Sequence, residues 1–336
     1  MAIGSHTIPR FYLEQFATPT RQGKPGNVWV YEKNKTARPS STKAQGYENG
    51  YFGFVRRDGT VDESFEKHLA KLEDRCNEAL VCAKSELYDL SSLAHRNELG
   101  FYMGMLFARS TSRRKFSAEN WSKIQKPFAE LEFDEEYVQD AAAHFSESTG
   151  VLNSPEKIRE MIRNQAASFS TKMLTGNTLI ENLLFHADTL KTELLTKPWQ
   201  VLEAPAGTEF VTSDNPVITF IKLREDLWHP GHGFRKPGVV VAFPLAPTAC
   251  LTVGVAGRDF QGVDAATVAR MNEMVISSCD RFVYSKSKSE DVSGAVNTLG
   301  GWCVPGKTAF LGQMPGKEQI EEHLRRTLKI PRRKAS

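Results

Sequence analysis

Long apolar runs are absent from this chain of 336 residues. The longest one covers residues 239–247 and contains two prolines, whereas a membrane-spanning helix needs about 20 apolar residues. The first residues also lack the basic segment and apolar stretch that are typical of a secretory signal. We therefore predict a cytoplasmic protein that does not enter a membrane.

Cysteine is scarce, and no two cysteines form a Cys-x-x-Cys pair. The pattern is typical of reduced, mostly buried thiols, and it argues against a disulfide scaffold. The phosphate-loop, dinucleotide-binding, zinc-protease and serine-hydrolase motifs are also missing, so those enzyme classes have no support. The five cysteines are Cys76, Cys82, Cys250, Cys279 and Cys303.

The composition, 40% hydrophobic and 25% charged, is that of a globular protein with ample material for a core. The formal net charge is +3. Residues 325–334 hold six basic side chains and no acidic one, so the positive excess belongs to the C-terminal tail. Such a tail either improves solubility or contacts nucleic acid.

The order of hydrophobic patterns predicts an α+β fold. A short helix and strands open the chain, a helical middle follows, and short β-type runs between turn residues predict a mostly antiparallel C-terminal sheet with which the N-terminal strands could pair. Residues 33–46 are polar and are expected to be loop. We predict one domain over 1–290 (helical about 61–196, sheet-rich about 199–285), an extension over 291–323 and a basic tail over 324–336.

The segment His6-Thr-Ile-Pro-Arg-Phe-Tyr-Leu-Glu-Gln-Phe16 carries the first group of candidate site residues. Pro9 suits the first turn of a short helix. The positive end of that helix favours a neutral His6, the form that acts as a general base or metal ligand. The guanidinium of Arg10 suits a phosphate or a carboxylate. The alternative is a buried segment in which His6 bonds to backbone and Arg10 forms a salt bridge.

Glu66 and Glu73 are seven residues apart and therefore lie on one side of a predicted helix. Converging carboxylates bind a divalent metal or hold arginines. Arg109 directly follows an apolar stretch, so we expect it to be partly buried and to pair with one of these glutamates or with an anionic substrate. The alternative is an ordinary solvated helix face.

Asp214 belongs to Thr212-Ser-Asp-Asn-Pro216, between two predicted strands. Asp and Ser side chains commonly cap such turns by bonding to nearby backbone, and this explains the local sequence. The functional alternative places Asp214 at a strand end as a metal ligand or as the group that orients His6.

These segments resemble a bacterial family catalogued as domain of unknown function 4238. The resemblance rests on the opening motif, on Ser213-Asp-Asn-Pro216, on Pro244-Leu-Ala-Pro247 and on Arg281-Phe-Val-Tyr-Ser285. It covers about residues 5–290. It implies one fold over most of the chain and selects four polar residues of the hallmark motifs, but it implies no activity. These residues are His6, Arg10, Tyr12 and Asp214.

Our leading hypothesis is a phosphodiester hydrolase that acts on nucleic acid or a nucleotide, an activity that would suit an anti-phage or toxin role. His6 would be the general base or acid, and Arg10 and Arg109 would stabilise phosphoryl charge. Tyr12 and Asp214 complete the predicted catalytic set.

Any metal in this site would be Mg²⁺ or Mn²⁺, held by Glu66, Glu73 and Asp214. The alternative function is a non-catalytic module that binds a nucleotide, a nucleic acid or a protein, with the hallmark motifs as a structural polar network. A third hypothesis is group transfer from a dinucleotide held by His6 and Tyr51.

Overall fold

The computed structural model describes most of the chain. It divides into two compact units, the first made of residues 1–115 and 179–308 and the second of residues 116–178 and 309–336. The described residues are 4–20, 24–49, 54–55, 61–62, 64–83, 89–111, 135–150, 152, 154–161, 176–224, 227–231 and 233–300.

The larger sheet of the first unit has the strand order β10-β9-β11-β12-β7-β13. Neighbouring strands are antiparallel, except that β13 runs parallel to β7. β11 and β12 are buried along their whole length, which explains why their sequences are continuous apolar runs. The bounds are β7 (Trp199–Glu203), β9 (Ile218–Lys222), β10 (Trp228–Pro230), β11 (Val239–Ala246), β12 (Ala249–Val253) and β13 (Phe260–Gly262).

A second, antiparallel sheet has the order β3-β2-β14-β8. Its central pair joins an N-terminal strand to a late one, so the N-terminal strands do pair with strands of the sheet-rich region. The prediction of loop over 33–46 is wrong at β3, because an exposed edge strand with Arg, Pro and Ser lacks apolar alternation. The bounds are β2 (Asn27–Glu32), β3 (Arg38–Ser41), β8 (Thr212–Ser213) and β14 (Phe282–Ser285).

Two short ribbons complete the described strands. β1 (Gly4–His6) pairs with β4 (Tyr47–Asn49), and β5 (Phe54–Val55) pairs with β6 (Val61–Asp62). The single-turn helix η1 (Thr42–Ala44) lies between β3 and β4.

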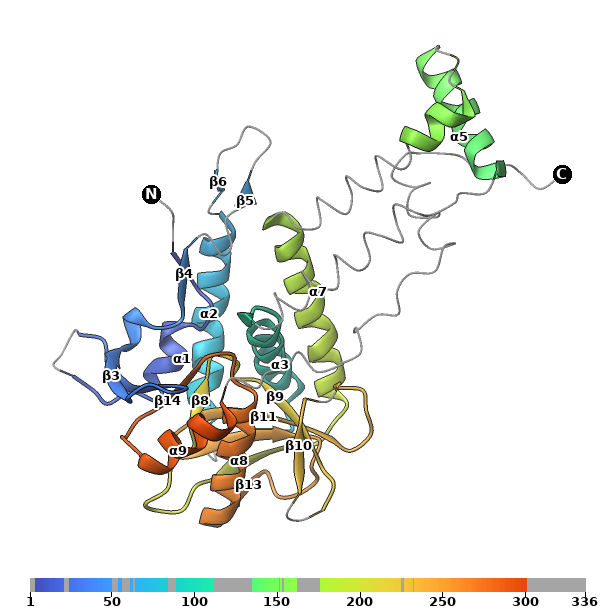
Figure 1. The fold of residues 1–336 in the computed structure, drawn as a ribbon. Coiled ribbons are helices and arrows are strands. Elements are labelled where there is room, and N and C mark those ends of the chain that lie inside the picture. Colours follow the sequence, from blue (N-terminus) through green and yellow to red (C-terminus); the bar gives the residue numbers. More distant parts are fainter. Residues whose placement is uncertain are drawn as a thin grey trace. The chain divides into compact units, whose positions relative to one another are not determined.

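The described helices comprise a short one near the N-terminus, those of the predicted middle of the chain and two later ones. α3 lies between α2 and α7 in Figure 1. A Cβ on Gly104 would lie 2.4 Å from the carbonyl oxygen of Ala187 in α7, so glycine permits this close approach. The bounds are α1 (Arg10–Glu14), α2 (Ser64–Cys82), α3 (Leu93–Ala108), α5 (Glu135–Thr149), α7 (Gly176–Leu195), α8 (Ala265–Ser277) and α9 (Glu290–Leu299).

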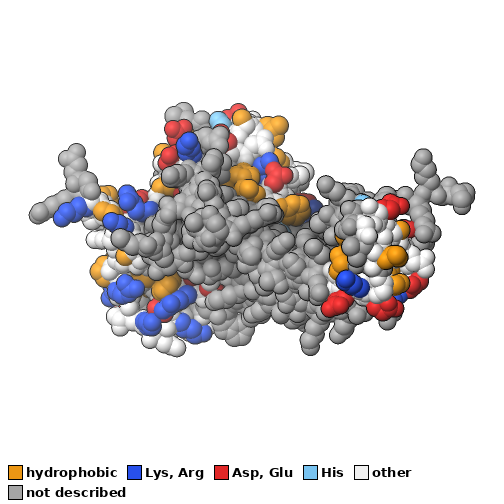
Figure 2. Space-filling view, turned by 90° about the horizontal axis from the view of Figure 1, so that it is seen from above, with side chains coloured by type: hydrophobic (Ala, Val, Ile, Leu, Met, Phe, Trp, Pro, Cys, Tyr) orange, Lys and Arg blue, Asp and Glu red, His pale blue; other side chains and the backbone are white. Residues whose placement is uncertain are grey.

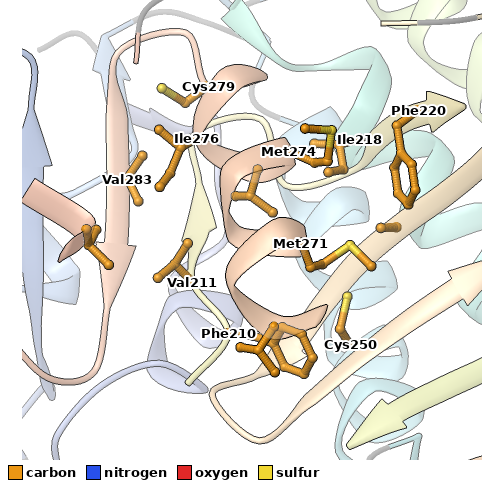
Figure 3. Close-up of a cluster of buried hydrophobic side chains, with 14 of the residues drawn as sticks. Phe210, Val211, Ile218, Phe220, Cys250, Met271, Met274, Ile276, Cys279 and Val283 are labelled. Atoms are coloured by element: carbon orange, nitrogen blue, oxygen red, sulfur yellow. The ribbon is translucent and has the colours of Figure 1, made fainter. Parts of the chain in front are cut away.

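A hydrophobic core cluster forms where α8 packs against both sheets (Figure 3). Met271 and Met274 of α8 face Ile218, Phe220 and Cys250 of the larger sheet. Each fully buried apolar side chain of this size contributes roughly 1.5–3 kcal/mol. The mixture of helices with mostly antiparallel sheets confirms the α+β prediction. Among the described residues, no helix combines the length and apolarity that crossing a membrane requires.

Candidate functional site

Tyr12 of α1 is sealed in the interior and joins two distant strands. Its hydroxyl donates to the carbonyl oxygen of Pro244 in β11 at 2.7 Å and lies 2.7 Å from the Thr212 hydroxyl of β8. Because Tyr12 has one proton to donate, Thr212 is the donor in the second bond. Burial raises the pKa of Tyr12 well above its usual value, although the bond with Thr212 opposes this. The phenol therefore stays protonated near neutral pH.

Replacement of Tyr12 by Phe is expected to lower the free energy of unfolding by about 1–3 kcal/mol, since buried groups of Thr212 and Pro244 lose their partner. Urea denaturation measures this change. In a double-mutant cycle with Thr212→Val, the two losses should be less than additive, because the second change removes the orphaned hydroxyl.

Tyr102 offers a matched control for that variant. It is fully buried, and its hydroxyl has no hydrogen-bond partner among the described residues. Tyr102→Phe should therefore leave stability nearly unchanged or raise it. Equal losses for Tyr12→Phe and Tyr102→Phe would contradict a specific role for the Tyr12 bonds.

Asp214 clamps the turn between α8 and β14. Its Oδ1 accepts the backbone N–H of Asp280 at 2.8 Å, and its Oδ2 accepts those of Arg281 at 2.7 Å and Phe282 at 2.9 Å. Burial raises the pKa of Asp214 to about 7, against the lowering effect of the N–H donors. The interpretation that this motif caps its own turn is confirmed for Ser213, whose Oγ accepts the Asn215 N–H at 3.2 Å. It is wrong for Asp214, because the backbone that its carboxylate caps lies 66–68 residues away.

Arg109 follows α3 and pairs with a glutamate of α2, which was one of the predicted alternatives. Its Nη1 donates to Oε1 of Glu73 at 2.6 Å. The Arg109 side chain is 0% exposed and that of Glu73 is 20% exposed, so only the Glu73 side chain of the pair reaches solvent.

Aromatic rings connect this ion pair with the opening motif. Tyr102 of α3 stacks on Phe11 with ring centroids 5.5 Å apart, and Phe243 contacts both Tyr12 and Tyr102, at 5.2 and 6.1 Å. Burial raises the pKa of Tyr102 well above its usual value, and the positive charge of Arg109 opposes this. The structure thus brings Tyr12, Tyr102 and the Arg109–Glu73 pair into one largely apolar cluster.

Arg10 lies on the surface instead. Its Nε is 3.6 Å from Oε1 of Glu14, one helical turn away, and its side chain is 52% exposed. Glu14 also accepts from the Thr42 hydroxyl at 2.6 Å and from the Gly26 N–H at 3.1 Å. Arg10 therefore sits beside η1 and the start of β2.

The remaining candidates are described only in part. The backbone of His6 pairs with Tyr47 in the β1–β4 ribbon, and Glu66 belongs to the first turn of α2. The imidazole of His6 and the carboxylate of Glu66 lie outside the described residues, as does Tyr51. Within the described part, no three His, Cys, Asp or Glu side chains form a metal-binding group. The metal site stays a prediction.

The sequence did not single out Thr212, Pro244 or Tyr102 as members of the candidate site. Thr212 directly precedes the Ser-Asp-Asn-Pro motif and Pro244 begins Pro-Leu-Ala-Pro. Their proximity to two singled-out motifs was the available signal, but neither carries an obvious catalytic group.

A family model described as "Protein of unknown function (DUF4238)" matches residues 5–289. No curated protein and no solved structure matches the chain.

Proposed function

We propose that this chain, which belongs to the DUF4238 family of proteins of unknown function, is a non-catalytic module that binds a nucleic acid or a nucleotide. In this proposal the hallmark motifs form a structural polar network. Ligand recognition then depends on surface side chains outside that network.

The hydrogen bonds of Tyr12 and Asp214 carry the proposal. The Tyr12 hydroxyl is occupied by Thr212 and Pro244, and both oxygens of Asp214 accept backbone N–H groups. Proton transfer by either group would break bonds that join distant parts of the fold. A catalytic acid or base instead needs to lie within hydrogen-bond reach of a substrate.

Phosphodiester hydrolysis is the second candidate, and Glu73 favours it. This carboxylate is partly exposed and is held by a fully buried arginine, an arrangement that fixes its position. Water would form a bond to phosphorus and pass its proton to Glu73 or His6, while the phosphorus–oxygen bond to the leaving group breaks and the departing alkoxide takes up a proton from solvent. Arg109 would be a positioning residue, and Mg²⁺ or Mn²⁺ would stabilise the phosphoryl charge.

Incubation of the full chain with end-labelled RNA and duplex DNA, with Mg²⁺, Mn²⁺ or a chelator, separates the two candidates. We expect binding without cleavage, and His6→Ala should leave the affinity within about twofold. Hydrolysis that falls by about 10²–10⁴-fold in His6→Ala, with unchanged thermal unfolding, would establish the second candidate instead. Lys236→Gln, an exposed change, is the control.

A further inference from the structure

The hairpin of residues 24–46, here called the basic hairpin, concentrates positive charge. It contains β2, β3 and η1, and its only acidic residue before β4 is Glu32. Four of its basic residues are exposed and Lys33 is partly exposed. The basic residues are Lys24, Lys33, Lys35, Arg38 and Lys43.

Most of this charge is not neutralised within the described fold. Glu32 pairs with Lys35 and with Arg281 of the neighbouring strand end, both at 2.8 Å. The other four basic side chains form no ion pair with any carboxylate that the structure describes. Exposed charges of one sign that lack partners attract ligands of the opposite sign.

Neighbouring segments extend the charged surface. Arg10 lies beside η1, where Glu14 contacts both. Lys286 and Lys288 follow β14, whose last residue pairs with Trp29 of β2, and both are exposed. Glu290 neutralises Lys288 at 2.7 Å, so Lys286 is the residue that adds charge here. Figure 2 shows Lys and Arg side chains at the left of the view, the side on which Figure 1 places β3.

The arrangement of these charges suits a polymer better than a single nucleotide. Lys24 precedes β2 and Lys33 follows it, and this six-residue strand is about 20 Å long. The charges are therefore spread along the hairpin and do not converge on one point. A nucleic-acid strand presents a phosphate about every 3.4 Å of duplex axis, so several phosphates can face the hairpin together.

The surface lacks the apolar side chains that a membrane-inserting patch uses. The large exposed hydrophobic residues in the described part of the chain lie on other segments, between Val81 and Leu227. We propose that the basic hairpin docks the sugar–phosphate backbone of a nucleic acid. This inference rests on the proposed binding function and names the surface that carries it out.

Fluorescence anisotropy with a labelled 20-base-pair DNA tests the proposal on the full chain. With about four phosphate contacts, affinity should fall roughly 10²-fold between about 50 and 200 mM salt. The hairpin variant Lys24→Gln, Lys33→Gln, Arg38→Gln and Lys43→Gln should bind at least about tenfold more weakly, with a salt dependence shallower by about 0.9 per lost contact. Thermal unfolding should not change, because these are surface residues.

Two controls separate the hairpin from net charge and from the tail. Lys71, Lys157, Lys236 and Arg258 are exposed and lie elsewhere, and their joint change to Gln should leave affinity within about twofold. Neutralising the six basic residues of 325–334 should retain binding that still depends on the hairpin. Wild-type affinity in the hairpin variant would overturn the proposal, as would binding to phosphatidylserine vesicles without binding to DNA.

The same samples distinguish failure of the hairpin from failure of the proposed function. A denaturing gel after each titration shows whether the probe is intact. If the probe stays intact and the hairpin variant binds it as tightly as the wild type does, only the proposal that the basic hairpin is the docking surface is rejected. A cleaved probe contradicts the non-catalytic function. In that case the affinities of the wild type and the hairpin variant for an uncleavable phosphorothioate DNA still test the hairpin.

Discussion

Replacing Arg109 by Ala should destabilise the protein by about 3–5 kcal/mol. Arg109 heads the largest fully buried side chains, so truncation leaves a cavity and separates the ion pair that joins the end of α3 to α2. Both effects are among the few that produce losses of this size. The free energy of unfolding from urea titration, monitored by circular dichroism, measures the loss.

Arg109→Met separates the two causes. Methionine keeps most of the volume and removes the charge, so its cost should be smaller, about 1–3 kcal/mol. Arg258→Ala, at an exposed position, should change stability by no more than about 0.5 kcal/mol. A loss below about 1 kcal/mol for Arg109→Ala would show that the pair does not hold the two helices together.

The Asp214→Ala variant should lose about 2–5 kcal/mol at about pH 5, because three backbone N–H groups lose their acceptor at once. The free energy of unfolding of Asp214→Asn should lie between those of Asp214→Ala and the wild type. The asparagine oxygen can still accept, but its amide nitrogen cannot accept the third bond. Asp259→Ala, an exposed aspartate, is the control and should be nearly neutral. A neutral Asp214→Ala would contradict the clamp.

The stability supplied by Asp214 should also depend on pH. Burial raises its pKa from 3.8 to about 7, so between these values the native state keeps a proton that the unfolded chain has released. Stability from this group is therefore fully present below about pH 3.8 and is lost as the pH rises through about 7. The difference in unfolding free energy between wild type and Asp214→Asn should shrink from about pH 5 to pH 8. A difference that grows with pH would show that the N–H bonds outweigh burial.

Local patterns predicted much of the fold. The strands over 199–203, 239–246 and 249–253 bury most or all of their residues, so their sequences contain apolar runs that need no partner to be recognised. Edge strand β3 escaped prediction because it buries no apolar face and is held by backbone bonds to β2.

The candidate site was predictable only where a local rule applied. The apolar stretch before Arg109 indicated a partly buried arginine that pairs with Glu66, Glu73 or an anionic substrate, and the structure shows Glu73 as its partner. The Asp214 motif indicated a cap, but the capped N–H groups belong to residues 280–282. The partners of Tyr12 depend on contacts across 200 and 232 residues, and no short-range pattern encodes such distances.

The long separation between Tyr12 and Pro244 has a consequence during biosynthesis. Ribosomes add roughly 5–20 residues per second, so α1 waits about 10–45 s for β11 to be made. Until then the Tyr12 hydroxyl, which is fully buried in the finished fold, lacks its Pro244 acceptor. The first helix to emerge therefore completes its interior hydrogen bonds only after β11 has been made.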